Sequence, residues 1–243
     1  MTHKMNSDRK TAIIVGVLFI AATVAGILSD VFGPNLDAPD YLANLSANGN
    51  QVLIGTLLVF TMAVLIAGIP IFMYPILKKY NETLALGYVV FRTIEVVFLI
   101  LCVISLLTLL TLSQEFVIAG TPDASYFQTL ATLLLAVREW GGGVFSTIVF
   151  SLSALMLNYI LYRSKLIPQW LSGWGLIGTT LYLGSGFLPL FGHDPRSTIY
   201  LLMEAPLALQ EMVLAVWLIV KGFNPSAIDS GSDKVDMGEG EKK

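Results

Sequence analysis

The stretch TLALGYVVFRTIEVVFLILCVISLLTLLTL, residues 83–112, decides the fold of this chain. It is about thirty residues long and almost entirely apolar, and a helix of that length exceeds the hydrocarbon core of a bilayer, which is about 30 Å thick. Arg92 and Glu95 are its only charged residues. A charged side chain at the bilayer centre costs about 2.5 to 3.5 kcal/mol, so it persists where a partner, a cavity or a function compensates it. The stretch therefore predicts a membrane-spanning helix that carries a polar site.

The composition of the whole chain points to the same class of protein. Of its 243 residues, 55% are hydrophobic and 13% are charged, and the mean hydropathy is +0.75. These values differ strongly from those of a soluble domain, so we expect the lipid bilayer to be a partner of the chain. The formal net charge is −3, and the few Lys and Arg residues are scattered. A basic surface for nucleic acid is therefore not expected.

Six apolar runs have the length of a membrane span. The fourth is longer than one span requires and is interrupted by three glycines, Gly141–Gly143, which leaves open whether its first part spans or lies in the outer interface. We expect an all-α, polytopic transmembrane bundle of about six helices, with one domain at residues 1–223. The tail at residues 224–243 is rich in Gly, Ser and charged residues and should be disordered. The expected spans are Ala12–Val31, Val52–Leu77, Thr83–Leu112, Tyr126–Tyr162, Pro168–Phe191 and Tyr200–Val220.

The distribution of positive charge sets the expected orientation, because loops with Lys and Arg are retained in the cytoplasm. Positive residues gather at the N-terminus, at Lys78 and Lys79, at Arg163 and Lys165, and at the C-terminus. The loops Phe32–Asn50 and Ser113–Ser125 contain neither Lys nor Arg, and both are acidic. We therefore expect both termini, including the tail, to be cytoplasmic.

Charged residues in or near the apolar runs form the candidate ligand- or proton-binding site. Arg92 and Glu95 are three residues apart, which places them on one face of their helix. Helical rise puts Glu95 and Glu211 near the midplane and Arg92 about a turn nearer the cytoplasm, while Glu204, two turns before Glu211, lies nearer the outside. We expect an inner cluster of Arg92, Glu95 and Glu211, and an outer cluster of Arg138, Glu139 and Glu204.

These clusters contain two arginines and four glutamates, so full ionisation would leave a negative excess in a low-dielectric region. Either one or two glutamates are protonated, because burial disfavours the charged form, or a cation, an amine or a water-filled cavity compensates them. Glu211 is the best candidate for a carboxylate that carries a proton or binds a ligand. The opposing interpretation, in which the charges are structural ion pairs that lock helices together, stays open.

Motifs for common cofactors and metals are missing or out of context. Residues 173–178, GWGLIG, satisfy the pattern G-x-G-x-x-G, but a dinucleotide site requires a preceding strand. Here the glycines begin a membrane helix, where small residues favour close packing. His3 and His193 lie outside the spans, and Cys102 is the only cysteine. We therefore expect no metal site, no cofactor and no catalytic residue, and we interpret Cys102 as a buried packing thiol.

Several short elements, taken in order, resemble a known family. They are RKTA at residues 9–12 leading into VGVLFIAAT at 15–23, RTIE at 92–95, YRSKLIP at 162–168 and WLIVKGF at 217–223. Together they are similar to the bacterial integral-membrane family catalogued as domain of unknown function 4386. The resemblance implies a bacterial membrane fold of six or seven helices and leaves the activity open. With the charge distribution, it implies a multi-pass protein of the inner (cytoplasmic) membrane.

Two functional hypotheses follow from the buried charges. In the first, the protein binds or transports a small molecule or a lipid, with Arg92 fixing an anionic group and Glu95 and Glu211 handling a proton or a cation. In the second, it is an interaction or stress-associated scaffold whose ion pairs are structural and whose protein partner is unknown. A lipid-modifying enzyme is the least favoured class, because no nucleophile, metal or cofactor set is recognisable.

Overall fold

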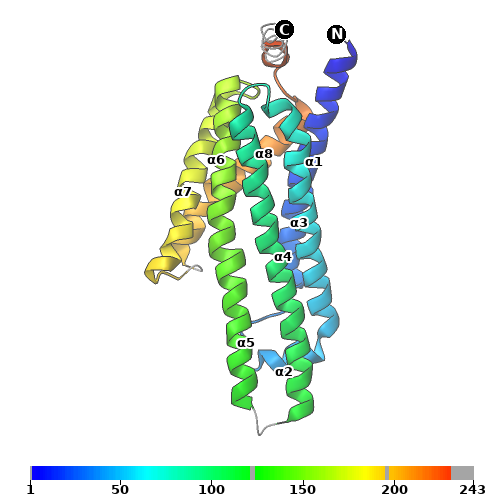
Figure 1. The fold of residues 1–243 in the computed structure, drawn as a ribbon, viewed down its shortest axis with the longest axis vertical. Helices are drawn as coiled ribbons and strands as arrows, with labels where there is room; N and C mark the ends of the chain where they lie inside the picture. The colour runs from blue at the N-terminus through cyan, green and yellow to red at the C-terminus, as the bar shows by residue number, and fades with distance from the viewer. Residues whose placement is uncertain (1, 121–123, 195–196, 231–243) are drawn as a thin grey trace.

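A computed structural model describes residues 2–120, 124–194 and 197–230 and shows an all-α bundle of long helices (Figure 1). Within these residues, five helical segments are long and apolar enough to cross a membrane. The expected all-α fold is confirmed, and the count of six spans stays a prediction. The helices are α1 Thr2–Phe32, α2 Tyr41–Ala47, α3 Gly49–Leu77, α4 Glu82–Ala119, α5 Ala124–Arg138, the π-helix Glu139–Phe145, α6 Ser146–Ser164, α7 Gln169–Phe187, the 3₁₀ turn Leu188–Phe191 and α8 Thr198–Val220.

The helices follow the expected spans in order, but their bounds differ, and α1 already begins at Thr2. α4 continues past Leu112 to Ala119. The glycines Gly141–Gly143 do not interrupt the fourth span, because residues 139–145 wind as a π-helix that joins α5 to α6. The loop between α1 and α3 contains α2, which is too short to give a clear helical period in the sequence.

The bundle is longer on one side than on the other. α4 has 38 residues and is about 57 Å long at 1.5 Å per residue, nearly twice the hydrocarbon thickness of a bilayer. α7 and α8 have only 19 and 23 residues. The far ends of α4 and α5 therefore extend beyond α7 and α8, where they meet α2 and the start of α3 (Figure 1).

Two large apolar cores fill the bundle at different levels, and a smaller one around Ala63 and Leu99 lies between α1, α3 and α4. The inner core joins α1, α3, α4, α6, α7 and α8 around buried side chains such as Tyr88, Leu157 and Leu214. The outer core joins α2 and α5 to α4 through Leu45, Leu109 and other buried side chains. Along α4, the inner core therefore ends near residue 88 and the outer core begins near residue 109, with Arg92 and Glu95 between them.

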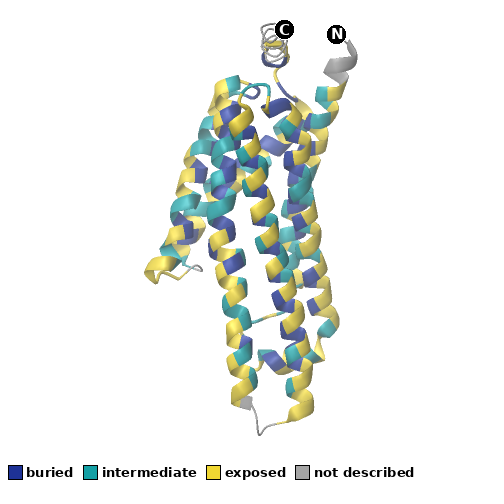
Figure 2. Cartoon of the chain, viewed as in Figure 1, coloured by how far each residue is buried: buried dark blue, intermediate teal, exposed yellow. Residues whose placement is uncertain are grey.

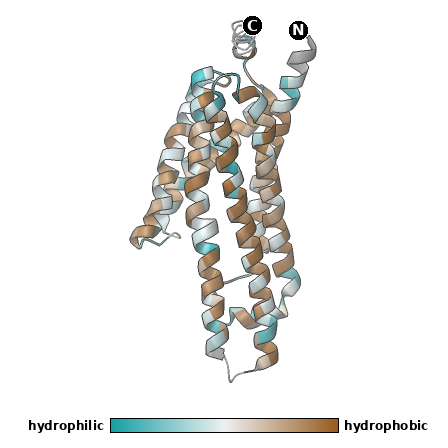
Figure 3. Cartoon of the chain, in the orientation of Figure 1, coloured by the Kyte–Doolittle hydropathy of each residue, from teal (hydrophilic) through white to brown (hydrophobic). Residues whose placement is uncertain are grey.

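The outer surface of the bundle is apolar over most of its length. Exposed positions alternate with buried ones along every long helix, and many exposed ones are hydrophobic (Figures 2 and 3). Leu57, Ile71 and Ile104 are examples of large apolar side chains on the outside. Such a surface suits contact with lipid, which supports the membrane assignment.

The start of α1 and the end of α8 lie at the same end of the bundle (Figure 1). Beyond α8, residues 225–230 form a short helical turn, and Ala227 and Ile228 are buried in the inner core. The packed chain thus continues past Phe223, the expected end of the domain. Residues 231–243 lie outside the described residues, so the disordered tail stays a prediction, as does the cytoplasmic location of both termini.

Candidate binding cavity

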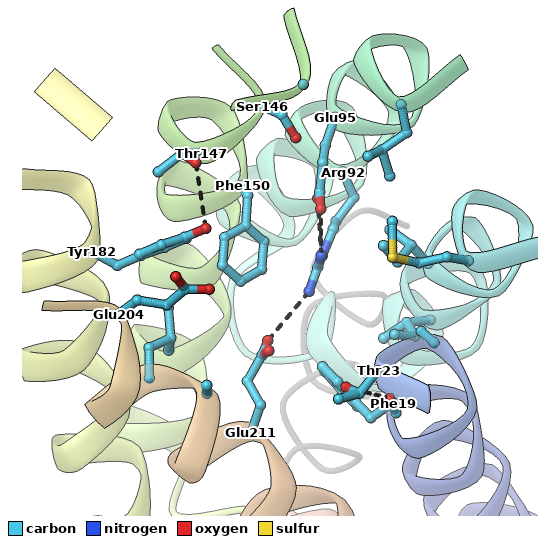
Figure 4. Close-up of a pocket in the computed structure, with 18 residues that line it drawn as sticks. Phe19, Thr23, Arg92, Glu95, Ser146, Thr147, Phe150, Tyr182, Glu204 and Glu211 are labelled. Atoms are coloured by element: carbon cyan, nitrogen blue, oxygen red, sulfur yellow. Dashed lines mark hydrogen bonds and ion pairs between the residues drawn. The ribbon is translucent and has the colours of Figure 1, made fainter. Parts of the chain in front are cut away.

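A cavity of about 280 Å³ lies beside Arg92 and Glu95, against the inner core and the smaller core around Leu99. Its lining side chains come from α1, α3, α4, α6, α7, α8 and the π-helix (Figure 4). Most of the wall is apolar and includes Phe19, Leu99 and Leu207. The charged side chains in the wall are Arg92, Glu95, Glu204 and Glu211.

Arg92 holds three helices together at this cavity. Its Nη1 donates to the carboxylate of Glu95 on the same helix, with distances of 2.9 and 3.2 Å to the two oxygens. Its Nη2 lies 3.6 Å from Oε1 of Glu211 on α8 (Figure 4). The guanidinium carbon also lies 4.6 Å from the ring centroid of Phe150 on α6, a cation–π contact. The structure thus brings together Arg92, Glu95 and Glu211, the three residues expected in the inner cluster.

Arg92 is left with little capacity for an anionic ligand. Both of its terminal nitrogens face carboxylates, and Phe150 covers one face of the guanidinium. Nε is buried and has no hydrogen-bond partner in the described part of the chain, and Nη2 reaches Glu211 at 3.6 Å, an ion-pair distance. The first hypothesis gave Arg92 an anionic group and gave the glutamates a proton or a cation. The geometry favours the role of the glutamates over the role of Arg92.

Glu204 faces the same cavity from α8, two turns before Glu211 (Figure 4). No hydrogen bond or ion pair of its side chain occurs within the described residues. It interacts electrostatically with Tyr182, which lines the cavity from α7. Thr147 on α6 lies 3.4 Å from the hydroxyl of Tyr182, so hydroxyl groups continue the polar side of the wall.

The expected outer cluster of Arg138, Glu139 and Glu204 does not share one cavity. Arg138 and Glu139 line a second cavity of about 460 Å³, together with Asp30 and Asp37, and Glu204 is not part of its lining. Arg138 and Glu139 lie at the junction of α5 and the π-helix. Helical rise gives the depth of a residue but not its direction around the bundle, which explains the difference.

Three cavities follow one another from the α1–α3 loop toward Arg92. The second cavity shares Met62, Leu99 and Gly142 with the first. A third, of about 580 Å³, lies at the loop between α1 and α3 and shares Asp30 and Arg138 with the second. The central cavity is therefore the last of three neighbouring cavities.

The family model described as Domain of unknown function (DUF4386) matches residues 14–222 of the chain. The chain belongs to this family. No curated protein and no solved structure matches it. The match confirms the family resemblance. The five long apolar helical segments of the described residues identify the DUF4386 protein as a multi-pass membrane protein. The family description states no activity, so the function of this protein has to be argued from its cavity.

The π-helix of the DUF4386 protein is shaped by one close contact. A Cβ atom at Gly142 would overlap the Sγ atom of Cys102 on α4, whereas one at Gly143 would meet nothing within 4 Å. The Cys102 thiol donates to the carbonyl of Arg138 at 3.6 Å. Cys102 is therefore a packing thiol, as expected, and Gly142 lets the π-helix approach α4 beside the cavity.

The contribution of α6 and α7 to the site was not predicted from the sequence. Ser146, Thr147, Phe150 and Tyr182 line the cavity, but hydroxyl and aromatic residues are common in membrane helices and carried no signal alone. The spacing of Ser146 and Phe150, four residues apart, places both on one helical face and is the signal that could have found them.

A second buried polar contact lies in the inner core of the DUF4386 protein. Gln210 Nε2 donates to Asn158 Oδ1 and to the carbonyl of Leu171, at 3.3 Å each. Both amides are at least 98% buried. This contact joins α6, α7 and α8 next to the cavity, and an asparagine in an apolar run was its available sequence signal.

Proposed function

We propose that this protein, in the inner membrane of a bacterial cell, binds a small molecule or a lipid-derived group in the cavity at Arg92, Glu95 and Glu211. The supporting observation is that these buried charges line a cavity of about 280 Å³. Protein interiors are close-packed and contain few voids larger than a water molecule. A cluster with a purely structural role would be expected to be closed by its neighbours. An apolar cavity of about 150 Å³ is large enough for benzene, so this one has room for a small ligand.

The surroundings of the cavity offer two routes of entry. Ala208 lines the cavity and is exposed on α8, and the side chain of Glu211 is 21% exposed. These features support entry from the side of the bundle. The series of cavities toward the α1–α3 loop supports a second route from the outer end. Transport rather than binding would use both routes in turn.

A comparison of retained molecules tests the proposal. Wild-type protein, Arg92→Gln and Glu211→Gln are purified, and their bound lipids and metabolites are identified by mass spectrometry. Glu115→Gln is the matched control, because Glu115 is exposed on α4 away from the cavity. A species retained by wild type and control and lost from both cavity variants supports the proposal. Identical profiles in all four proteins, with unchanged stability, would contradict it.

The scaffold function is the second candidate, and one observation favours it. Arg92 is 3% exposed and both of its terminal nitrogens are engaged, as in a structural ion pair. This candidate predicts that Arg92→Met, Glu95→Gln and Glu211→Gln, combined in one protein, leave partner binding unchanged. If the wild type recovers a partner and the triple variant does not, the charges take part in partner binding, and the prediction of a purely structural cluster is contradicted.

A further inference from the structure

The charged wall of the cavity is unbalanced. Three carboxylates, from Glu95, Glu204 and Glu211, face a single guanidinium. Arg92 is engaged by Glu95 at 2.9 Å and by Glu211 at 3.6 Å, which leaves Glu204 without a positive partner among the residues that the structure describes. The next acidic residue, Asp30 on α1, interacts electrostatically with Glu204 and adds negative potential. A wall of this kind attracts a positive ligand and repels a negative one.

Two polar groups in the wall have no hydrogen-bond partner among the described residues. One is the Glu204 carboxylate, and the other is the Ser146 hydroxyl. Both groups line the same cavity, where they are available to a polar ligand group.

Aromatic rings stand beside the unpaired carboxylate. Tyr182 and Phe150 form an edge-to-face pair with ring centroids 5.7 Å apart, and both line the cavity. Aromatic faces attract cations, and the contact of Arg92 with Phe150 already uses this property. Within the described residues, no group of three or more His, Cys, Asp or Glu side chains is arranged to hold a metal ion. An ammonium group suits this wall better than a metal ion does.

We infer that the ligand of this cavity is a small organic cation whose ammonium group pairs with Glu204 beside Tyr182. This inference rests on the proposed function and names the ligand class for the same cavity. Glu204 and Glu211 are seven residues apart, about 10 Å along the helix axis. At that spacing the ammonium group pairs with one of the two carboxylates, and we assign it to Glu204 because Glu211 already faces Arg92. The apolar wall around Phe19 and Leu207 receives the rest of the molecule. The volume allows a ring with a short chain.

Three probes of matched size test the inference: 2-phenylethylamine, 2-phenylethanol and phenylacetate, which are a cation, a neutral molecule and an anion near neutral pH. Binding to the protein in lipid nanodiscs is measured by equilibrium dialysis, with empty nanodiscs subtracted. We expect the amine to bind about tenfold more tightly than the alcohol, and phenylacetate to bind most weakly. Glu204→Gln should weaken the amine about tenfold and leave the alcohol unchanged, the effect of about one lost ion pair. Glu115→Gln should behave as wild type.

The outcomes separate this inference from the proposed function. If all three probes bind wild type equally, or if Glu204→Gln leaves amine affinity unchanged, the cation class is wrong and the cavity is still a binding site. If no probe binds wild type, the cation class is also wrong, and the retained-ligand comparison decides the proposed function separately. Should Glu204→Gln not fold, Tyr182→Leu provides the test, because it removes the aromatic face and should weaken the amine more than the alcohol.

Discussion

Arg92 on α4 and Glu211 on α8 form an ion pair across the bundle, with 3.6 Å between Nη2 and Oε1. The shorter contact of Arg92, 2.9 Å to Glu95, lies within α4 and cannot connect helices. The side chain of Glu211 is also the more exposed partner, at 21% against 7% for Glu95. The charged contact between α4 and α8 is therefore the weaker of the two, and Glu211 is held less tightly by Arg92 than Glu95 is.

This asymmetry predicts unequal effects of two substitutions. Arg92→Gln leaves Glu95 buried close to Glu211 without a positive charge, and losing one partner of a buried pair costs about 3 kcal/mol. Glu211→Gln keeps the Arg92–Glu95 pair and should cost about 1 kcal/mol or less. Equilibrium unfolding in detergent micelles measures both. Equal destabilisation by the two variants would show that Arg92 depends on Glu211 as much as on Glu95.

The π-helix predicts opposite outcomes for neighbouring glycines. Gly142→Ala places a Cβ atom against Cys102 Sγ, and overpacking of this kind costs about 1 to 3 kcal/mol. Gly143→Ala meets nothing within 4 Å, so it should leave stability unchanged or raise it by about 0.5 kcal/mol, since alanine is the better helix former. Thermal unfolding distinguishes the two variants. Adding Cys102→Ala should restore the stability lost in Gly142→Ala. If it does not, the overpacking is not against Cys102.

A contact between the first and last long helices yields a further prediction. Arg9 donates to the carbonyls of Leu218 and Ile219 at 2.9 and 2.6 Å, and thereby caps the C-terminal end of α8. Cations and hydrogen-bond donors at this end stabilise a helix by about 1 kcal/mol. Arg9→Gln should therefore increase amide exchange in the last turn of α8, measured by hydrogen–deuterium exchange. Lys10→Gln, at an exposed neighbouring position, is the control and should leave that turn protected.

The parts of the fold that were predictable are those set by local patterns. The length of the apolar run predicted α4. The three-residue spacing predicted that Arg92 and Glu95 share one helical face, and helical rise predicted that Glu211 lies at a similar depth. The glycines of the π-helix were misjudged as an interruption, because glycine disfavours helices in isolation. In the structure Gly142 packs against Cys102, which lies forty residues away and cannot be paired with it from one sequence.

The outer cluster failed for a related reason. Residue depth follows from counting along a helix, but the direction in which Glu204 and Arg138 point depends on how α8 and α5 are rotated in the bundle. Glu204 belongs to the cavity of Arg92, and Arg138 to the cavity near Asp30. The contributions of Ser146 and Tyr182 were hidden for the same reason, because only packing decides which hydroxyl groups face a cavity.

The turn at residues 225–230 should detach from the bundle at high pH. It is held by the hydroxyl of Tyr80, in the loop between α3 and α4, which donates to the carbonyl of Ala227 at 2.7 Å. Burial, with repulsion from Asp8 and Asp229, raises the pKa of Tyr80 from 10.0 to about 12. The folded state thus favours the neutral phenol, which is also the form that donates. Its stabilising contribution is complete below pH 10 and is lost as the pH rises through about 12.

Two measurements check this contact. An ultraviolet difference titration of wild type against Tyr80→Phe should show one phenol with a midpoint near pH 12, and a midpoint near 10 would contradict the buried hydrogen bond. Near neutral pH, Tyr80→Phe should open the turn, because a lost hydrogen bond costs about 1 kcal/mol and raises the open population about fivefold. Limited proteolysis within residues 225–230 reports that population. Tyr162→Phe, at an exposed position near the end of α6, should leave cleavage unchanged, since its hydroxyl makes no contact with this turn.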